Sequence, residues 1–187
     1  MRAESFIKGA RTRTFLGLLP PPSQRSAMRR AAEEITRGPG TETWLYGEPW
    51  LHVSLAGLLE GAGDEAVAAL GDAADAVAYR PFDVAFDHII SWRNNCLVAA
   101  GTDNVVGLIE LHERIATALA KQGFRGPTRF TPHVTLAKSP IDFGDTDIRP
   151  VRWTVTEFVL LHRWPRARRY AVLGRWPLGG PRRGALI

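Results

Sequence analysis

The sequence predicts an α+β protein. Apolar runs of strand length alternate with three segments of helical periodicity, and some of the strands follow one another directly, as in hairpins. The pentapeptide His-Val-(Ser/Thr)-Leu-Ala occurs twice, starting at His52 and at His133, which indicates two similar halves that each deliver one copy. The sequence has no glycine-rich phosphate loop of the Walker or dinucleotide-binding type, so a doubly wound parallel sheet is not favoured.

The first half of the chain alternates strands with helices. Residues 14–19 are a short apolar run that three prolines stop, which predicts a strand. Residues 23–37 carry apolar side chains at helical spacing and end at a Gly-Pro-Gly breaker. Residues 50–58 predict a second strand, and the alanine-rich residues 64–79 a second helix.

The second half begins with a predicted hairpin, in which residues 82–92 and 96–100 flank an Asn-Asn turn. Residues 105–122 have leucine and isoleucine stepping along one face before Gly123, which predicts the clearest helix of the chain. Three further strands are expected at residues 130–137, 154–161 and 169–176.

Size and composition are those of one globular domain. We expect residues 1–178 to form a single bilobal domain and residues 179–187 a flexible basic tail. The chain lacks a long apolar run and a signal-peptide core, so a cytoplasmic location without a membrane span is expected. A monomer is expected as well. One cysteine, Cys96, excludes an internal disulfide and a cysteine-rich zinc site, and its apolar neighbours predict a core position.

Basic residues dominate the C-terminal part. The net charge is +5, and residues 149–183 contain nine arginines but a single acid, Glu157. Such a region attracts a phosphate-bearing partner. A merely solubilising surface is the alternative, and charge by itself leaves both open.

The repeated pentapeptide carries the chemistry. On a strand, side chains two residues apart share a face, so His52 lies with Ser54 and His133 with Thr135, while the intervening valines and leucines face a core. Each copy therefore presents an imidazole beside a hydroxyl. Two imidazoles across a cleft suit displacement at phosphorus, because one can accept a proton from water while the other donates one to the leaving oxygen.

The histidines also allow other interpretations. A metal site needs a third ligand, yet neither copy has an acidic residue in the next four positions, so no metal and no other cofactor is expected. The remaining histidines read as structural: His88 in a strand, His112 on the surface of a helix, and His162 in a solvated turn.

The two motifs resemble those of the 2H phosphoesterase superfamily, and within it the RNA 2′,3′-cyclic phosphodiesterase family, also called 2′-5′ RNA ligases. The segments Arg13-Thr14-Phe15-Leu16, residues 48–55 and residues 129–138 are similar to the family's opening strand and its two motifs. The resemblance implies an α+β, bilobal fold of two antiparallel sheets with pseudo-twofold symmetry around a central cleft.

The resemblance also implies an activity. The family hydrolyses 2′,3′-cyclic phosphate ends of RNA to 2′-phosphomonoesters and joins RNA ends through 2′-5′ bonds in reverse. By position, His52 is the expected proton donor and His133 the acceptor, with Ser54 and Thr135 holding the phosphate. Ser54 replaces the usual threonine.

Six further residues are candidates for substrate binding. The cationic ones stand at or before the second motif, and the aromatic ones are expected near the cleft, where they would stack a base. They are Lys138, Arg129, Arg125, Phe15, Trp92 and Phe130. Two alternatives stay open: a small substrate, such as ADP-ribose 1″,2″-cyclic phosphate or a 2′-5′ oligonucleotide, and a non-catalytic module that binds RNA ends.

Overall fold

The computed structural model describes residues 12–38, 42–126, 129–180 and 185–186. Strands make up most of the elements, which follow one another as β1 (Arg13–Leu18), α1 (Pro22–Ile35), β2 (Trp44–Leu45), the 3₁₀ turn η2 (Glu48–Trp50), β3 (Val53–Glu60), α2 (Asp64–Asp75), β4 (Phe82–Trp92), β5 (Cys96–Ala100), α3 (Val106–Lys121), β6 (His133–Lys138), β7 (Asp145–Val155), β8 (Glu157–Arg163), β9 (Ala171–Pro177) and β10 (Ala185–Leu186). No helix in these ranges is long and apolar enough to cross a membrane.

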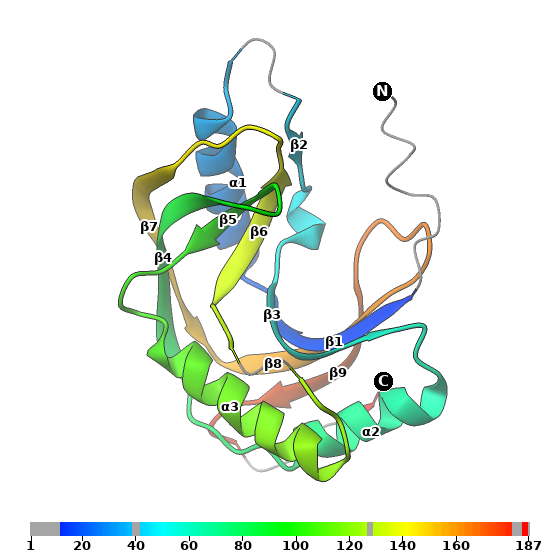
Figure 1. Ribbon diagram of the computed structural model, residues 1–187. Helices are drawn as coiled ribbons and strands as arrows, with labels where there is room; N and C mark the ends of the chain where they lie inside the picture. Colours follow the sequence, from blue (N-terminus) through cyan, green and yellow to red (C-terminus); the bar gives the residue numbers. More distant parts are fainter. Residues whose placement is uncertain (1–11, 39–41, 127–128, 181–184, 187) are drawn as a thin grey trace.

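The strands form one antiparallel sheet with two related halves. Its order is β10-β9-β8-β1-β3-β6-β5-β4-β7, and β2 pairs with β6 (Figure 1). The halves meet where Val53 of β3 lies opposite Val134 of β6. On either side of this junction the motif strand is followed by three antiparallel neighbours, β1, β8 and β9 or β5, β4 and β7. The predicted α+β class and its two-part antiparallel sheet are confirmed, with the two expected sheets joined edge to edge.

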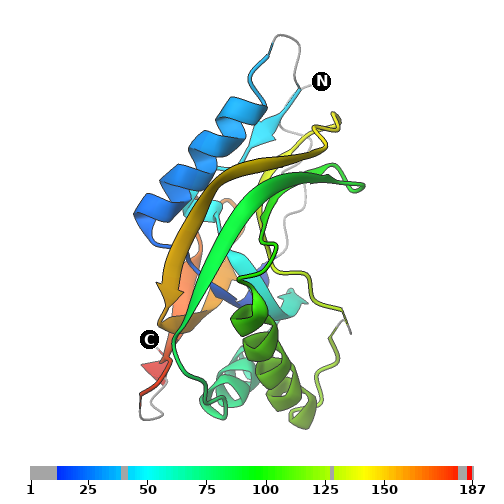
Figure 2. The same ribbon diagram turned by 90° about the vertical axis from the view of Figure 1, so that its left-hand side faces the viewer.

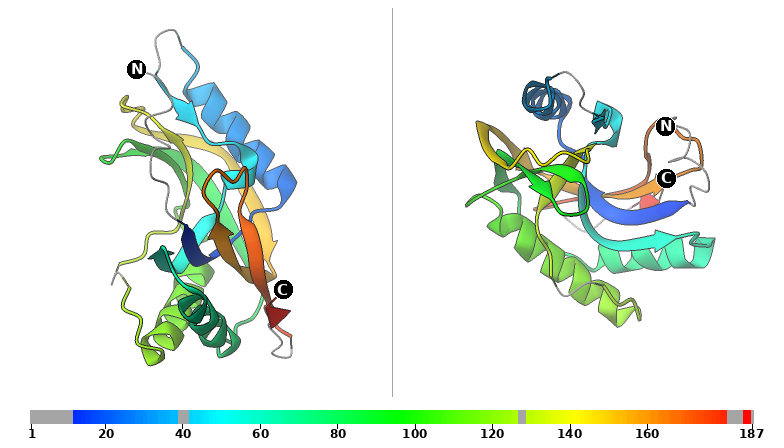
Figure 3. Two further views of the ribbon diagram at one scale, coloured as in Figure 1. Left: turned by 90° about the vertical axis from the view of Figure 1, so that its right-hand side faces the viewer. Right: turned by 45° about the horizontal axis from the view of Figure 1, so that its top comes forward.

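Helices pack against each half of the sheet. Helix α1 lies along β7 and β6, whereas α2 and α3 lie together against β1, β3 and β4 (Figures 2 and 3). Their buried faces follow the helical period, as in Met28 and Ala32 of α1 or Leu108, Leu111 and Ile115 of α3. This packing places Val53 and Val134 in the core, so the opposite face of the junction is left for polar side chains.

Most expected elements are present, and one is wrong. The hairpin between β4 and β5 turns at Asn95, which has a positive φ of 61°. Residues 154–161, expected as one strand, belong to two: β7 pairs with β4 in one half, and β8 pairs with β1 in the other. The chain crosses between the halves at Thr156, inside a run of strand-forming residues that gave no turn signal. Part of the tail, β10, pairs with β9, and the predicted flexibility of the tail stays a prediction.

Candidate active site

The junction of the two halves brings the two histidine motifs together. Because Val53 lies opposite Val134 in an antiparallel pair, the flanking residues place His52 beside Thr135 and Ser54 beside His133. Cross-strand neighbours of this kind have Cβ atoms about 5 Å apart. Val53 and Val134 are fully buried, so alternation puts the four motif side chains on the other face of the sheet. The result is two imidazoles and two hydroxyls in one patch.

Hydrogen bonds fix the first imidazole. His52 Nδ1–H donates to the carbonyl oxygen of Trp50 (2.7 Å), and the Ser54 hydroxyl donates to His52 Nε2 (3.1 Å). These two bonds suit the neutral ring with its proton on Nδ1. The ring packs against Phe15 and against the edge of Tyr170, each with its centroid 4.9 Å away. Aromatic surfaces on two sides shield much of the His52 ring from water and leave its side chain partly exposed.

The second imidazole is held in the same way. His133 Nδ1–H donates to the carbonyl oxygen of Thr131 (2.7 Å), two residues upstream, as His52 does to Trp50. The indole of Trp92, at the end of β4, lies 4.4 Å from the His133 ring. In both motifs the Nδ1 position is therefore occupied, and Nε2 is the atom left for chemistry.

Burial favours the neutral form of both rings. It lowers the pKa of His52 from 6.5 to about 4, with a smaller lowering by the charge of His133, while the Trp50 carbonyl opposes the shift. Burial also lowers the pKa of His133, and the Thr131 carbonyl opposes it. At neutral pH each ring can accept a proton at Nε2 before a substrate arrives.

A glycine lets the first motif strand lie close to its neighbour. Gly17 of β1 pairs with Ser54 of β3. A Cβ on Gly17 would lie 2.7 Å from the carbonyl oxygen of Val53, a distance that carbon and oxygen atoms do not tolerate. Any larger residue would push β3, and with it Ser54 and His52, out of place.

The six predicted substrate-binding residues are placed differently. Phe15 and Trp92 flank the two catalytic candidates, as the contacts above show. Lys138 does not extend freely, because its Nζ donates to the carbonyl oxygen of Asn94 (3.2 Å) and to Cys96 Sγ (2.9 Å) in the β4–β5 hairpin. Cys96 is buried, as expected. Arg125 and Arg129 are exposed in the connection from α3 to the second motif.

His112 was expected on the surface and is buried, 8% exposed. Its Nδ1–H donates to the carbonyl oxygen of Leu55 (2.6 Å), directly after Ser54 in β3. Its ring stacks on Phe130 at 4.3 Å, just before the second motif. His112 thus connects β3 with the segment just before β6, and Phe130, a candidate for base stacking, packs here against the hydrophobic core.

His162, expected in a solvated turn, is also buried, at 4% exposure. Its Nδ1 lies 2.8 Å from the Thr14 hydroxyl of the neighbouring strand. The position is set by the pairing of β8 with β1, where Thr14 stands opposite His162. Burial lowers the pKa of His162, which favours its neutral form.

Two aromatic residues at the site were missed from the sequence. Tyr170 contacts His52, Phe15 and Trp50, and burial raises its pKa to about 12. Trp50 in turn supplies the carbonyl that holds His52 and lies under the guanidinium of Arg163, 5.2 Å away. Tyr170 stands beside an arginine run far along the chain, so no local pattern connected it to the first motif.

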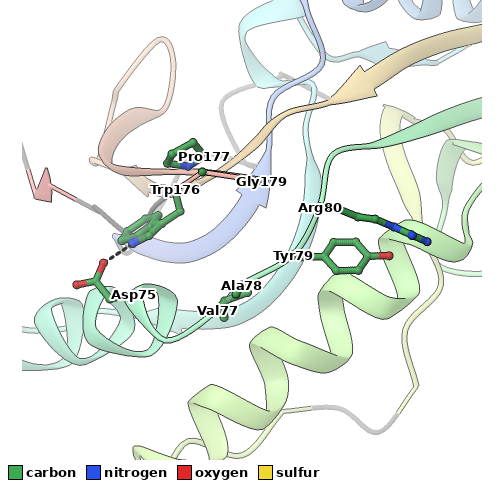
Figure 4. Close-up of a pocket in the computed structure, with 9 residues that line it drawn as sticks. Asp75, Val77, Ala78, Tyr79, Arg80, Trp176, Pro177 and Gly179 are labelled. Carbon is green, nitrogen blue, oxygen red and sulfur yellow. Dashed lines mark hydrogen bonds between the residues drawn. The ribbon is translucent and has the colours of Figure 1, made fainter.

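Two further features of the described residues bear on possible sites: clusters of metal-ligating side chains and a pocket. Nowhere in them do three or more His, Cys, Asp or Glu side chains gather as metal ligands would. A pocket of about 340 Å³ lies between the end of α2 and the end of β9, lined by residues such as Tyr79, Arg80 and Trp176 (Figure 4). Its one acid, Asp75, accepts a hydrogen bond from Trp176 Nε1 (2.5 Å). The four motif residues are not among those that line this pocket.

Comparisons with known proteins identify the family and the fold. The family model of the 2′-5′ RNA ligase superfamily matches residues 20–164, more than half of the chain. The structure is similar to that of E. coli LigT complexed with 3′-AMP, with 25% sequence identity, coverage of 91% of this chain and 99% of that one, and a TM-score of 0.73. It is similar to a structure described as a phosphoesterase, with 26% identity, coverage of 90% and 98%, and a TM-score of 0.73. The PDE domain of MHV ns2 shares the fold at 20% identity, with coverage of 82% and 98% and a TM-score of 0.56. No curated protein matches the chain.

Proposed function

Since the chain belongs to the 2′-5′ RNA ligase superfamily of 2H phosphoesterases, we propose that it opens 2′,3′-cyclic phosphate ends of RNA to 2′-phosphomonoesters. The observation that carries the proposal is the junction of β3 and β6, where both histidines and both hydroxyls share one face. The nucleotide bound to the E. coli relative, 3′-AMP, supports a ribose phosphate as the ligand of such a site.

The proposed reaction is an in-line displacement by water. His133 Nε2 accepts a proton from the attacking water while the oxygen of that water forms a bond to phosphorus. The bond from phosphorus to O3′ breaks, and His52 Nε2–H donates its proton to O3′. The products are a 2′-phosphomonoester and a 3′-hydroxyl, and the two histidines exchange protonation states. The general acid and the general base each contribute about 10²–10⁴-fold to the rate.

His52 must be protonated before it can act as the acid. Its pKa of about 4 keeps it neutral in the free protein, but an anionic phosphate beside Nε2 favours the imidazolium and raises the pKa. The Ser54 hydroxyl, which donates to Nε2 in the free protein, is then released to a phosphate oxygen. Thr135 holds a second non-bridging oxygen, so both hydroxyls stabilise the charge that develops there.

The test is turnover of a 5′-labelled RNA with a 2′,3′-cyclic phosphate end in excess EDTA. We expect a 2′-phosphate product from the wild type and a loss of about 10²-fold or more in His52→Ala and in His133→Ala. His88→Ala is the matched control, because His88 Nδ1 is bonded to Asp87 outside both motifs (2.8 Å).

Three outcomes would contradict the proposal. An inactive wild type that still binds the RNA end would favour a binding module. Activity on small cyclic phosphates but not on RNA would change the substrate class. Activity lost in EDTA would show that the reaction depends on a metal.

A further inference from the structure

The connection between β8 and β9 is an arginine-rich loop of residues 164–170, called here the β8–β9 loop. Arg166, Arg168 and Arg169 are exposed on it, and no acidic residue occurs between Glu157 and the end of β9. A tight turn presents these side chains: Arg166 has a positive φ of 61°, and the amide of Ala167 donates to the carbonyl oxygen of Trp164 (3.2 Å). The loop rises beside β1 in Figure 1.

Both ends of the β8–β9 loop are anchored at the candidate active site. At its C-terminal end, Tyr170 packs edge-on against His52 and against Trp50, 5.0 Å away. At its base, the guanidinium of Arg163 lies over the Trp50 ring. The loop is therefore a direct extension of the surface around His52, not a separate patch.

The arginine side chains of the loop take no part in the ion pairs found among the described residues. Ion pairs occupy Arg13, Arg29 and Arg175 with acids elsewhere, but within the described ranges none joins Arg163 or the three loop arginines. The Nε atom of Arg163 is buried without a hydrogen-bond partner. Trp164, next to it, is 55% exposed. In the described residues the three loop guanidinium groups thus have no ion pair, and Trp164 stays more than half exposed although its ring packs against that of His162 (4.2 Å).

This combination suits single-stranded nucleic acid. Cationic side chains that follow a phosphate backbone, with an aromatic ring on which a base stacks, are the usual elements of such a surface. We propose that the β8–β9 loop binds the RNA strand on the 5′ side of the reactive phosphate. The proposal rests on the proposed function, because it takes His52 as the position of the 3′ end. Arg166, Arg168 and Arg169 then contact phosphates, and Trp164 stacks a base.

The first experiment measures binding without turnover. The probe is a fluorescent single-stranded RNA of about eight nucleotides with a 3′-phosphate, followed by anisotropy at several salt concentrations. The triple variant Arg166→Gln/Arg168→Gln/Arg169→Gln is compared with Arg30→Gln/Arg37→Gln/Lys121→Gln, which removes the same charge from exposed positions on or beside the outer helices α1 and α3.

We expect the loop variant to bind at least tenfold more weakly than wild type and the control to bind nearly as well. Plots of log affinity against log salt have a negative slope, whose magnitude decreases by about 0.7 for each phosphate contact that is lost on a single strand. The loss of three contacts therefore reduces this magnitude by about 2 in the loop variant. Equal affinities and slopes for the two variants would overturn the proposal.

The second experiment tests the aromatic contact. Trp164→Ala is expected to weaken RNA binding roughly tenfold, while Trp164→Phe keeps most of it, because a base stacks on either aromatic ring. If the arginine variant binds weakly but Trp164→Ala does not, the loop attracts any polyanion, and the assignment to RNA is wrong.

Turnover separates this proposal from the proposed function. In wild type, kcat/KM is expected to be higher for the oligonucleotide than for a 2′,3′-cyclic mononucleotide, and the loop variant loses this preference while retaining mononucleotide activity. A wild type that binds RNA through the loop but opens no cyclic phosphate would contradict the proposed function and leave the loop proposal intact. A loop variant with unchanged length preference would contradict the loop proposal and leave the proposed function intact.

Discussion

The two histidine motifs share one design and differ in their surroundings. Both rings donate from Nδ1 to a carbonyl two residues upstream at 2.7 Å. His52, however, is enclosed by Phe15 and Tyr170, and Ser54 donates to its Nε2. Among the residues that the structure describes, His133 has one aromatic neighbour, Trp92. Burial lowers the pKa of both, that of His52 as far as about 4.

The comparison shows how a repeated motif acquires two roles. Identical hydrogen bonds set the tautomer in both halves, whereas the unequal aromatic enclosure sets how strongly each ring resists a charge. Only the first half carries Tyr170 and the β8–β9 loop. The halves are thus alike in the Nδ1 bond that leaves Nε2 for chemistry, and unlike in the side chains around Nε2, where a substrate approaches.

The largest expected effect comes from removing both imidazoles. Each single alanine variant is expected to lose about 10²–10⁴-fold in kcat. The double variant His52→Ala/His133→Ala is expected to lose far less than the product of the two losses, because acid and base act in one step. Single-turnover rates on cyclic-phosphate RNA measure this. Fully multiplicative losses would mean that the two halves act independently.

The hydroxyls are expected to matter less and in different ways. Ser54→Ala and Thr135→Ala each remove a donor to a phosphate oxygen and are expected to cost roughly 10–10²-fold in kcat. Ser54→Ala also removes a bond that favours neutral His52, so the pKa of His52 rises and the pH profile shifts, whereas Thr135→Ala leaves it in place. Identical pH profiles for the two variants would show that the Ser54 bond does not influence His52.

The sequence predicted what depends on local pattern. The alternation around Val53 and Val134 was enough to place His52, Ser54, His133 and Thr135 on one face, and the structure agrees. Their catalytic roles stay predictions. Strand, helix and hairpin positions followed from periodicity and turn residues in the same way.

The predictions that were wrong or missing concern residues whose positions depend on contacts between distant segments of the chain. His112 sits on an amphipathic helix at a position that the period alone leaves ambiguous, and only the packing of α3 on β3 buries it. Tyr170 reaches His52 because β8 and β9 return beside β1. The crossover at Thr156 has no glycine, proline or asparagine to mark it.

Stability is expected to depend on pH through the first motif. The pKa of His52 is about 4 in the folded protein and about 6.5 in the unfolded chain, so the unfolded state binds more protons between these values. Stability is therefore full above pH 6.5 and is lost as the pH falls toward 4, on the order of 2 kcal/mol by pH 5 for this group. Urea unfolding of wild type and His52→Asn at pH 7 and pH 5 measures the difference. An equal decrease in both proteins would assign the loss to other groups.

The smallest expected effect tests the aromatic enclosure itself. Tyr170→Ala removes the ring edge that packs on His52 and admits water to it, so the pKa of His52 is expected to rise from about 4 toward 6.5. Imidazole proton resonances followed by NMR across pH 3–8 report this directly, and Trp92→Ala should act on His133 instead. If Tyr170→Ala leaves His52 unchanged, the enclosure comes from Phe15 and the strand backbone, and the difference between the halves lies in the sheet rather than in the loop.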